Sequence, residues 1–364
     1  MPVTNKNTAL IAMSGGVDSS TTAALLKSRG HDVMGVTMSL WRESSPYKGG
    51  EHGGCFGPDE AEDIAAASDL CARIGIPFRV FDCSREYEER IIAYFRNEYL
   101  AGRTPNPCVR CNAMMKFGML PELVRNAGIE FDSFATGHYA RVERLPSGRM
   151  GLRRAVDLAK DQSYFLCRLS QEQLGWIQFP LGEMRKSEVR ELARSFGLPV
   201  AEKHDSQDFY SGDPNELIGE PDRPGEIVEA ETGRVLGRHT GYWKYTIGQR
   251  KGLGVASTEP LYVTAIDPCH NRVVLGRHDA VIHHFLEADD MNWVSITPPE
   301  KPIECLLKAR SVQTPVPCTL TPLPGGRVAA TFPQGIHAVA PGQAAVFYSD
   351  NLLLAGGFIR TARE

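Results

Sequence analysis

The sequence predicts an α/β protein with an N-terminal doubly wound parallel sheet, a small central β-rich domain and a C-terminal β-barrel. Apolar runs alternate with helical patterns from residue 8 to about residue 205, which is typical of a parallel sheet covered on both faces. From about residue 209 the helical periodicity fades and short alternating strands take over. Residues 280–364 contain five or six such strands, which favours a small barrel. We therefore expect three domains, at residues 1–208, 209–279 and 280–364.

Composition limits the class of protein. The 364 residues are 42% hydrophobic and 23% charged, as in soluble globular proteins. There is no apolar run of membrane-spanning length and no signal peptide pattern, so we expect a cytoplasmic protein without a membrane partner. Nine irregularly spaced cysteines do not indicate a disulfide framework. A net charge of −4 gives no global sign of nucleic-acid binding, so an RNA partner would need a local basic surface.

The first βα turn carries the strongest motif. The apolar run Ala9–Ala12 predicts a buried strand, and Thr21–Arg29 predicts a helix. Between them lies the octet Met13–Ser20, with the sequence MSGGVDSS. A glycine turn before a helix N-terminus directs backbone N–H groups at one point, which suits phosphate. The octet is neither a Walker loop nor a Gly-x-Gly-x-x-Gly motif. Within it, Asp18 either orients the loop or a Mg²⁺ ion, or caps the helix.

Further strands and helices follow in alternation. The sequence predicts a helix opened by Pro58 and Asp59 and another helix between two later strands. Cys83 follows the third strand, at the sheet edge where ligands of open α/β sheets bind. The predicted elements are strands at 33–38, 78–82 and 131–138, a helix at 86–100, and a hairpin at 139–156.

A proline-rich segment precedes two clustered cysteines. Residues 102–112 read GRTPNPCVRCN, and the two prolines predict a rigid loop that stays out of a helix. The loop ends in Cys108-x-x-Cys111, and we expect Asn112 to cap the next helix. Clustered cysteines in a reducing compartment are more often catalytic or metal-binding than structural.

Six motifs together resemble one family. The octet is similar to the pyrophosphatase loop of ATP-dependent adenylating enzymes. Taken in order with it, five stretches resemble the tRNA-uridine 2-sulfurtransferase family over residues 8 to about 358: AGRTPNP from 101, ATGHY from 135, KDQSYFL from 160, GQRKGLG from 248 and PGQAAVFY from 341. The resemblance implies an adenine-nucleotide α-hydrolase-like fold and 2-thiolation of the wobble uridine of tRNA. It implies ATP with Mg²⁺, adenylation of uracil O2, and sulfur attack at C2 with release of AMP.

The resemblance also implies roles for individual residues. Cys111 aligns with the catalytic nucleophile, and the target base would be held by Asn106, Pro107 and Cys108. The nucleotide contacts would be Ala12, Met13, Ser14, Gly15, Gly16, Val17, Asp18, Ser19, Met38 and Gly137. The tRNA contacts would be His138, Lys160, Asp161, Gln162, Arg310, Ser311 and Gln343. By its sequence alone, Met38 is equally well explained as a core methionine.

The chain departs from the family at two positions. Cys108 stands where the commonest form of the family has Asp, and Tyr210 stands where that form has its persulfide-bearing second cysteine. Either Cys108 and Cys111 act as a persulfide and disulfide pair, or Cys83, Cys108 and Cys111 hold a [4Fe-4S] cluster. For Cys83 a buried apolar role is the plain alternative. The sulfur donor would be a persulfide carrier protein or sulfide.

Two other functions fit parts of the pattern. The first is another adenylating ligase, such as an amidotransferase, although the chain shows no glutaminase domain as an ammonia source. The second is a nucleotide- or RNA-binding protein without catalysis, which the tyrosine at 210 favours slightly. The presence of both the loop and the Cys-x-x-Cys pair argues against it.

Overall fold

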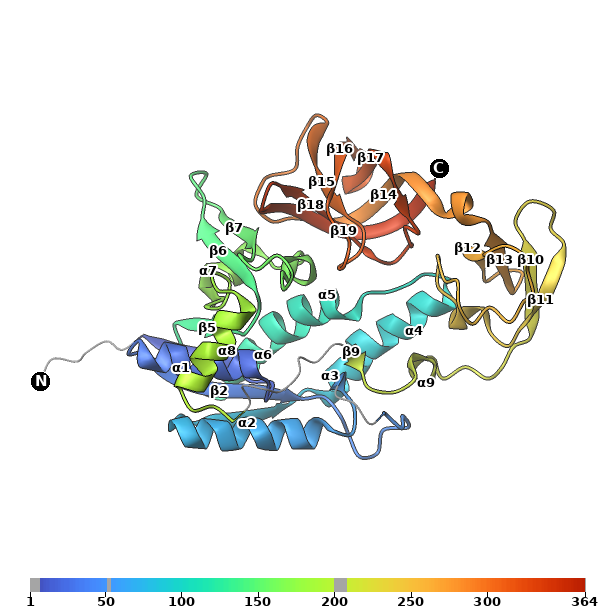
Figure 1. Ribbon diagram of the computed structural model, residues 1–364. Helices are drawn as coiled ribbons and strands as arrows, with labels where there is room; N and C mark the ends of the chain where they lie inside the picture. Colours follow the sequence, from blue (N-terminus) through green and yellow to red (C-terminus); the bar gives the residue numbers. More distant parts are fainter. Residues whose placement is uncertain (1–6, 51–53, 200–207, 364) are drawn as a thin grey trace, which may run out of the picture. The chain divides into compact units, whose positions relative to one another are not determined.

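A computed structural model describes residues 7–50, 54–199 and 208–363 (Figure 1). The chain divides into two compact units. The first unit contains Met1–Arg90, Cys108–Asp213 and Asn351–Leu353, and the second contains Ile91–Pro107, Pro214–Asp350 and Leu354–Glu364. No helix in these described ranges is long and apolar enough to cross a membrane.

The first unit is organised around a parallel sheet with strand order β4-β2-β1-β5-β8. Ala9 of the central strand lies opposite Val33 on one side and Ser133 on the other. Strand order reverses on either side of β1, which confirms the predicted doubly wound sheet. The strands are β1 (Thr8–Ala12), β2 (Asp32–Ser39), β4 (Phe78–Asp82), β5 (Ser133–Ala135) and β8 (Ile177–Gln178).

Each face of this sheet buries an apolar layer. Ile11 belongs to a core that is shared with α1 (Val17–Ser28), α2 (Glu60–Ile74) and α8 (Lys186–Ser195). Phe134 of β5 instead packs against Phe117, with ring centroids 5.8 Å apart. Cys71 of α2 is fully buried. The remaining helical elements are α3 (Ser84–Tyr87), α5 (Pro107–Cys111), α6 (Leu120–Asn126), α7 (Gln171–Trp176), the 3₁₀ turn η3 (Ser163–Leu166) and two π-helices, η1 (Glu88–Ile92) and η2 (Asn112–Met119).

Two strand pairs complete the first unit. The predicted hairpin is confirmed as β6 (Ala140–Arg144) and β7 (Met150–Arg154), which pair in antiparallel fashion. A short parallel pair joins β3 (Gly54–Phe56) to β9 (Asp208–Tyr210). The pair brings the chain after β2 beside Tyr210.

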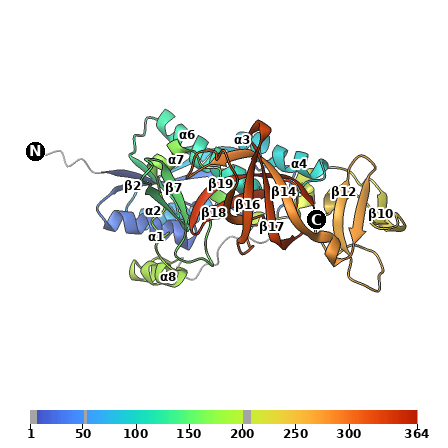
Figure 2. The same cartoon turned by 90° about the horizontal axis from the view of Figure 1, so that it is seen from above.

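The second unit contains α4 (Ala93–Leu100), a four-stranded sheet and the barrel. Six of the described strands form a barrel in the order β14-β17-β16-β15-β18-β19, closed by antiparallel pairing of β14 with β19. Figure 2 shows the barrel strands β14, β16, β17, β18 and β19 gathered in one group. This confirms the β-rich second half and its barrel. The four-stranded sheet is β11 (Val235–His239), β10 (Gly225–Glu229), β13 (Arg272–Gly276) and β12 (Tyr262–Asp267); the barrel strands are β14 (Ile282–Trp293), β15 (Ile303–Lys308), β16 (Val316–Leu323), β17 (Arg327–His337), β18 (Ala344–Ser349) and β19 (Leu352–Arg363). Short helical turns in this unit are α9 (Pro214–Ile218), η4 (Tyr242–Lys244), η5 (His278–Val281) and η6 (Pro324–Gly326).

Local predictions around the cysteines were wrong. Residues 107–111 form helix α5 instead of a loop, because Pro107 occupies its first position, where proline has no hydrogen bond to lose. Asn112 does not cap a helix: helical backbone continues through it, and its side chain donates to the Phe165 carbonyl at 3.3 Å. The helix after the octet begins at Val17, four residues before its predicted start.

Candidate nucleotide and thiol site

The octet forms the predicted tight turn at the carboxyl end of β1. Gly15 has φ +68°, and a Cβ there would lie 2.7 Å from the Asp63 carbonyl oxygen, so glycine is required. The Ser14 N–H donates to the Ser19 hydroxyl at 3.2 Å, which folds the turn onto the first turn of α1. The N-cap residue, Gly16, makes no side-chain cap, and the N-terminus of a helix suits an anion.

Gly137 lies against the same loop. A Cβ on Gly137 would be 2.7 Å from both the Asp18 carbonyl carbon and the Ser19 nitrogen. The structure therefore brings the end of β5 and the octet together, as the two predicted nucleotide motifs require. Met38 lies half-buried near the carboxyl end of β2, the strand beside β1, and is not a fully buried core methionine.

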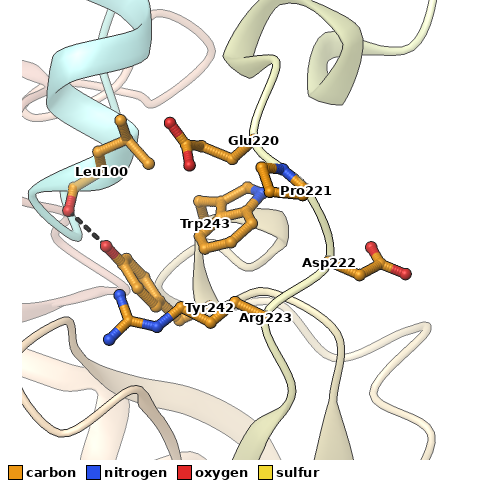
Figure 3. A pocket seen from close by; sticks show the side chains of 7 residues that line it. All are labelled: Leu100, Glu220, Pro221, Asp222, Arg223, Tyr242 and Trp243. Carbon is orange, nitrogen blue, oxygen red and sulfur yellow. Dashed lines mark hydrogen bonds between the residues drawn. The ribbon is translucent and has the colours of Figure 1, made fainter.

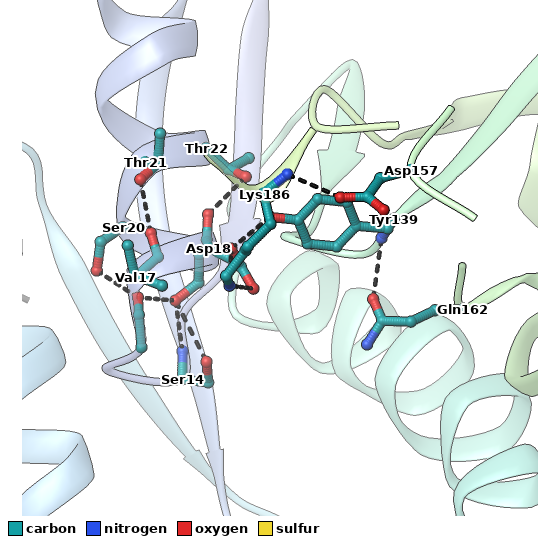
Figure 4. A network of polar contacts seen from close by, with 12 residues as sticks. Ser14, Val17, Asp18, Ser20, Thr21, Thr22, Tyr139, Asp157, Gln162 and Lys186 are labelled. Carbon is teal, nitrogen blue, oxygen red and sulfur yellow. Dashed lines mark hydrogen bonds and ion pairs between the residues drawn. The ribbon is translucent and has the colours of Figure 1, made fainter. Parts of the chain in front are cut away.

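Asp18 is held by an ion pair and does not cap the helix. Both of its carboxylate oxygens accept hydrogen bonds from the Lys186 ammonium at 2.8 Å, and Oδ1 also accepts one from the Tyr139 hydroxyl at 2.8 Å (Figure 4). The side chains of Asp18 and Lys186 are 25% and 11% exposed. The carboxylate is thus fixed beside the loop in a largely dry environment.

Two contacts outside the loop place the partners of Asp18. The Tyr139 N–H donates to Gln162 Oε1 at 2.9 Å, and the Lys186 N–H donates to the Asp157 carboxylate at 3.0 Å (Figure 4). Sequence reasoning missed Lys186, although it opens the clearly periodic helix α8. One signal in the sequence could have pointed to Lys186. It is a lysine in the first turn of a helix, where the helix dipole favours an acidic residue.

The two clustered cysteines lie on α5. Residues three apart in a helix share a face, so Cys108 and Cys111 lie one turn apart on the same side. Both are partly exposed, whereas Cys83 is fully buried. The pKa of the Cys111 thiol is raised to about 12, mainly by burial; Cys55 contributes to the increase, and the Lys116 charge opposes it. Burial likewise raises the pKa of Cys83 to about 12.

The thiols do not fit a metal cluster. Within residues 7–50, 54–199 and 208–363, no group of three His, Cys, Asp or Glu is placed to hold a metal ion. The predicted [4Fe-4S] ligand set of Cys83, Cys108 and Cys111 is therefore not assembled there. Full burial of Cys83 agrees with the apolar alternative for this residue.

Tyr210 is a structural side chain in β9. Its hydroxyl accepts a hydrogen bond from the Gly49 N–H at 3.0 Å, and its ring centroid lies 6.0 Å from that of Phe56. Residues 205–207, the start of the segment where the family carries its second cysteine, lie outside the described residues. Tyr210 has no sulfur atom and is buried among these partners, so it cannot replace the second cysteine of the family in a sulfur relay with Cys111.

The predicted tRNA contacts in the first unit include residues that bond to other parts of that unit. The Asp161 side chain is 1% exposed and pairs with Arg154 at 3.0 Å, while Gln162 orients Tyr139. His138 is half-buried and its Nδ1 lies 2.7 Å from the Thr136 hydroxyl. Burial and the Lys116 charge hold its pKa well below the usual value. Lys160 is half-buried.

The other predicted contacts belong to the second unit. Gln343 Nε2 donates to the carbonyls of Thr104 and Pro105, both at 3.2 Å, which fixes the chain just before Asn106 and Pro107. Asn106 is half-buried and Pro107 is buried. Arg310 donates to the Ala338 carbonyl, and Ser311 next to it is half-buried.

A pocket of about 420 Å³ also lies in the second unit (Figure 3). Its lining includes the buried residues Tyr242 and Trp243, together with Arg223 and Glu220, whereas the Asp222 side chain points away from the two rings (Figure 3). The Tyr242 hydroxyl donates to the Leu100 carbonyl at 2.7 Å. No residue predicted from the sequence as a site residue lines this pocket.

The doubly wound sheet, the glycine loop at its first βα turn and two helix-borne thiols in the same compact unit define a nucleotide-binding α/β protein. Three family models match the chain: a tRNA methyl transferase HUP domain at residues 7–210, a tRNA methyl transferase PRC-barrel domain at 217–277 and an aminomethyltransferase beta-barrel domain at 283–359.

Three similar proteins are all named tRNA-specific 2-thiouridylase MnmA. The protein of Endomicrobium trichonymphae is 47% identical, with 96% of this chain and 98% of that protein aligned. The protein of Chloroflexus aurantiacus is 45% identical (96% and 97% aligned), and that of Geotalea uraniireducens is 44% identical (97% and 95% aligned). The chain belongs to the tRNA-specific 2-thiouridylase family.

Proposed function

We propose that this protein is an ATP-dependent tRNA-uridine 2-sulfurtransferase that thiolates the wobble uridine of tRNA. The observation that carries the proposal is the occurrence, in one compact unit, of a loop suited to phosphate and a helix presenting two thiols. The family membership of nearly the whole chain supports tRNA as the substrate.

The proposed chemistry has two displacements. Uracil C2 is a poor electrophile because its oxygen is a poor leaving group. In the first step O2 attacks the α-phosphorus of ATP, the bond to the β-phosphate breaks, and pyrophosphate leaves. In the second step sulfur attacks C2 and AMP departs with the former O2. The N–H groups at the start of α1 and the octet suit the phosphates. Mg²⁺, when bound, would neutralise phosphate charge.

Asp18 and Lys186 support the nucleotide site in this proposal. Because the carboxylate is paired with Lys186, it orients the loop and the lysine. Lys186 then provides a positive charge beside the octet. Ala12 to Ser19, Met38 and Gly137 are the proposed nucleotide contacts.

Sulfur delivery is assigned to the α5 pair. Cys111 carries a persulfide whose terminal sulfur bonds to C2; the Cys108 thiolate then attacks the Cys111 sulfur. The S–S bond to the substrate breaks, thiouridine leaves with the electron pair, and a Cys108–Cys111 disulfide forms. A dithiol reductant supplies two electrons and two protons to restore the thiols. The persulfide sulfur comes from a carrier protein or from sulfide with an oxidant. Asn106 and Pro107 are proposed to hold the base.

The tRNA is proposed to contact His138, Lys160, Arg310, Ser311 and Gln343. Asp161 and Gln162 act indirectly by fixing neighbouring residues. In the proposed division into domains at residues 1–208, 209–279 and 280–364, catalysis belongs to the first domain, and the contacts named above belong to the first and the third. Contacts of basic residues with phosphates should make tRNA binding weaken steeply with salt.

The decisive experiment follows the products. Full-length protein with ATP, Mg²⁺, unmodified tRNA and a persulfide donor should yield AMP, pyrophosphate and 2-thiouridine, the last detected by nucleoside mass spectrometry. Cys111→Ser should still release pyrophosphate but form no thiouridine. Formation of ADP and phosphate in place of AMP and pyrophosphate would overturn the proposed chemistry.

A further inference from the structure

A π-helix follows the proposed nucleophile directly. In η2 the Leu120 N–H donates to the Met115 carbonyl, five residues earlier, whereas an α-helix bonds residues four apart. In an α-helix a residue five positions after Cys111 would point about 140° away from it. In the π-helix residues five apart are hydrogen-bonded, and we call this spacing the π register. It puts Lys116 one hydrogen-bonded turn beyond Cys111, on the same side of the helix. Single π turns of this kind frequently occur at functional sites.

Gln173 holds this register from the neighbouring helix α7. Its Nε2 donates to the carbonyls of Ala113 at 2.9 Å and Phe117 at 3.1 Å, both within η2. Its Oε1 accepts from the Ser170 N–H at 2.9 Å, so the amide is fixed at both ends. Widening a helix leaves carbonyls poorly paired, and these two hydrogen bonds compensate for that loss.

The Lys116 charge reaches two groups of the proposed site. It lowers the pKa of the Cys111 thiol, against the effect of burial, and it lowers the pKa of His138. The ring of Phe117, the next residue, lies 5.7 Å from the His138 ring. His138 follows Gly137, which packs on the octet. The Lys116 charge therefore acts both on the thiol and on His138, and Lys116 is half-buried, where a charge acts strongly.

We propose that Lys116 is a positioning residue for sulfur transfer, which the π register of η2 directs at Cys111 to stabilise its anionic sulfur. The inference rests on the proposed function, because it assigns the ammonium to the thiolate and persulfide forms of Cys111. The Lys116 ammonium also suits the second proposed step, because negative charge then passes from the attacking sulfur to the phosphate of the departing AMP.

The test measures Cys111 without tRNA or turnover. Full-length protein is alkylated with iodoacetamide over neutral and alkaline pH, and the rate at Cys111 is followed by peptide mass spectrometry. We expect Lys116→Met to slow alkylation about tenfold near pH 8, which corresponds to about one pKa unit, and to move the profile to higher pH. Lys116→Arg should retain most of the rate. Gln173→Met, which releases the register, should give a partial loss.

The matched control is Arg125→Met, which removes an exposed cation that stacks on Phe131 at 4.5 Å. Its Cys111 profile should equal that of the wild type. An unchanged profile in Lys116→Met, or in Lys116→Gln if the methionine variant does not fold, would overturn the inference. Failure of wild-type protein to release pyrophosphate with tRNA would instead overturn the proposed function, and the alkylation profiles would still decide the role of Lys116.

Discussion

The ion pair between Asp18 and Lys186 offers the sharpest test of how the octet is held. Each carboxylate oxygen lies 2.8 Å from Nζ, and the Tyr139 hydroxyl completes the arrangement. Replacing Lys186 by Met removes the charge and keeps a chain of similar length. The Asp18 carboxylate then remains beside the loop and keeps the hydrogen bond from the Tyr139 hydroxyl, but it has lost its ammonium partner.

The expected cost follows from burial. Breaking a fully buried pair by removing one partner costs about 3–5 kcal/mol. Here the two side chains are 11% and 25% exposed, and Tyr139 still bonds the carboxylate. We therefore expect a loss of about 2 kcal/mol, between that range and the roughly 0–1 kcal/mol of surface pairs. For a domain of this size the melting temperature should fall by roughly 4–8 °C.

A double-mutant cycle isolates the pair. The free energy of unfolding is measured by urea denaturation for the wild type, Lys186→Met, Asp18→Asn and the double variant. We expect a coupling energy of about 1–2 kcal/mol, and reduced ATP binding in each single variant. A coupling energy below about 0.3 kcal/mol, the usual limit of additivity, would show that the pair does not hold the loop.

Three further predictions concern single residues. Gly137→Ala should abolish ATP binding measured by calorimetry, because its Cβ would lie 2.7 Å from the octet backbone, whereas Gly175→Ala, with open space around its Cβ, should bind normally. Burial lowers the pKa of His138, so below about pH 6.5 the unfolded chain binds one proton more than the folded protein. The free energy of unfolding should therefore keep the His138 contribution above that pH and decline below it by up to about 1.4 kcal/mol per pH unit. His138→Gln should flatten this decline in urea titrations. In native protein, maleimide should label the exposed Cys55 rapidly and leave the buried Cys318 unlabelled until the chain unfolds; equal rates would contradict the burial.

Much of the fold was predictable because local patterns agree with it. Alternating apolar runs predicted the parallel sheet. The loss of helical periodicity near residue 209, where short alternating strands begin, predicted the β-rich half and its barrel. The spacing of Gly15 and Gly16 after a buried strand predicted the loop, since few residues allow a φ of +68°. These features depend on residues that are near one another in the chain.

The partners of the site residues depended on tertiary structure. Lys186 lies 168 residues after Asp18, and no periodicity links the two positions. Pro107 predicted a loop, yet its place at the first position of α5 makes it compatible with a helix. The π register of η2 depends on Gln173, which approaches from another helix. By itself the sequence determined the class of fold, the loop and the thiol pair, because backbone conformation and side-chain chemistry are local. Only the tertiary structure decided which charges face that loop and those thiols, because such contacts form when distant segments pack together and exclude water.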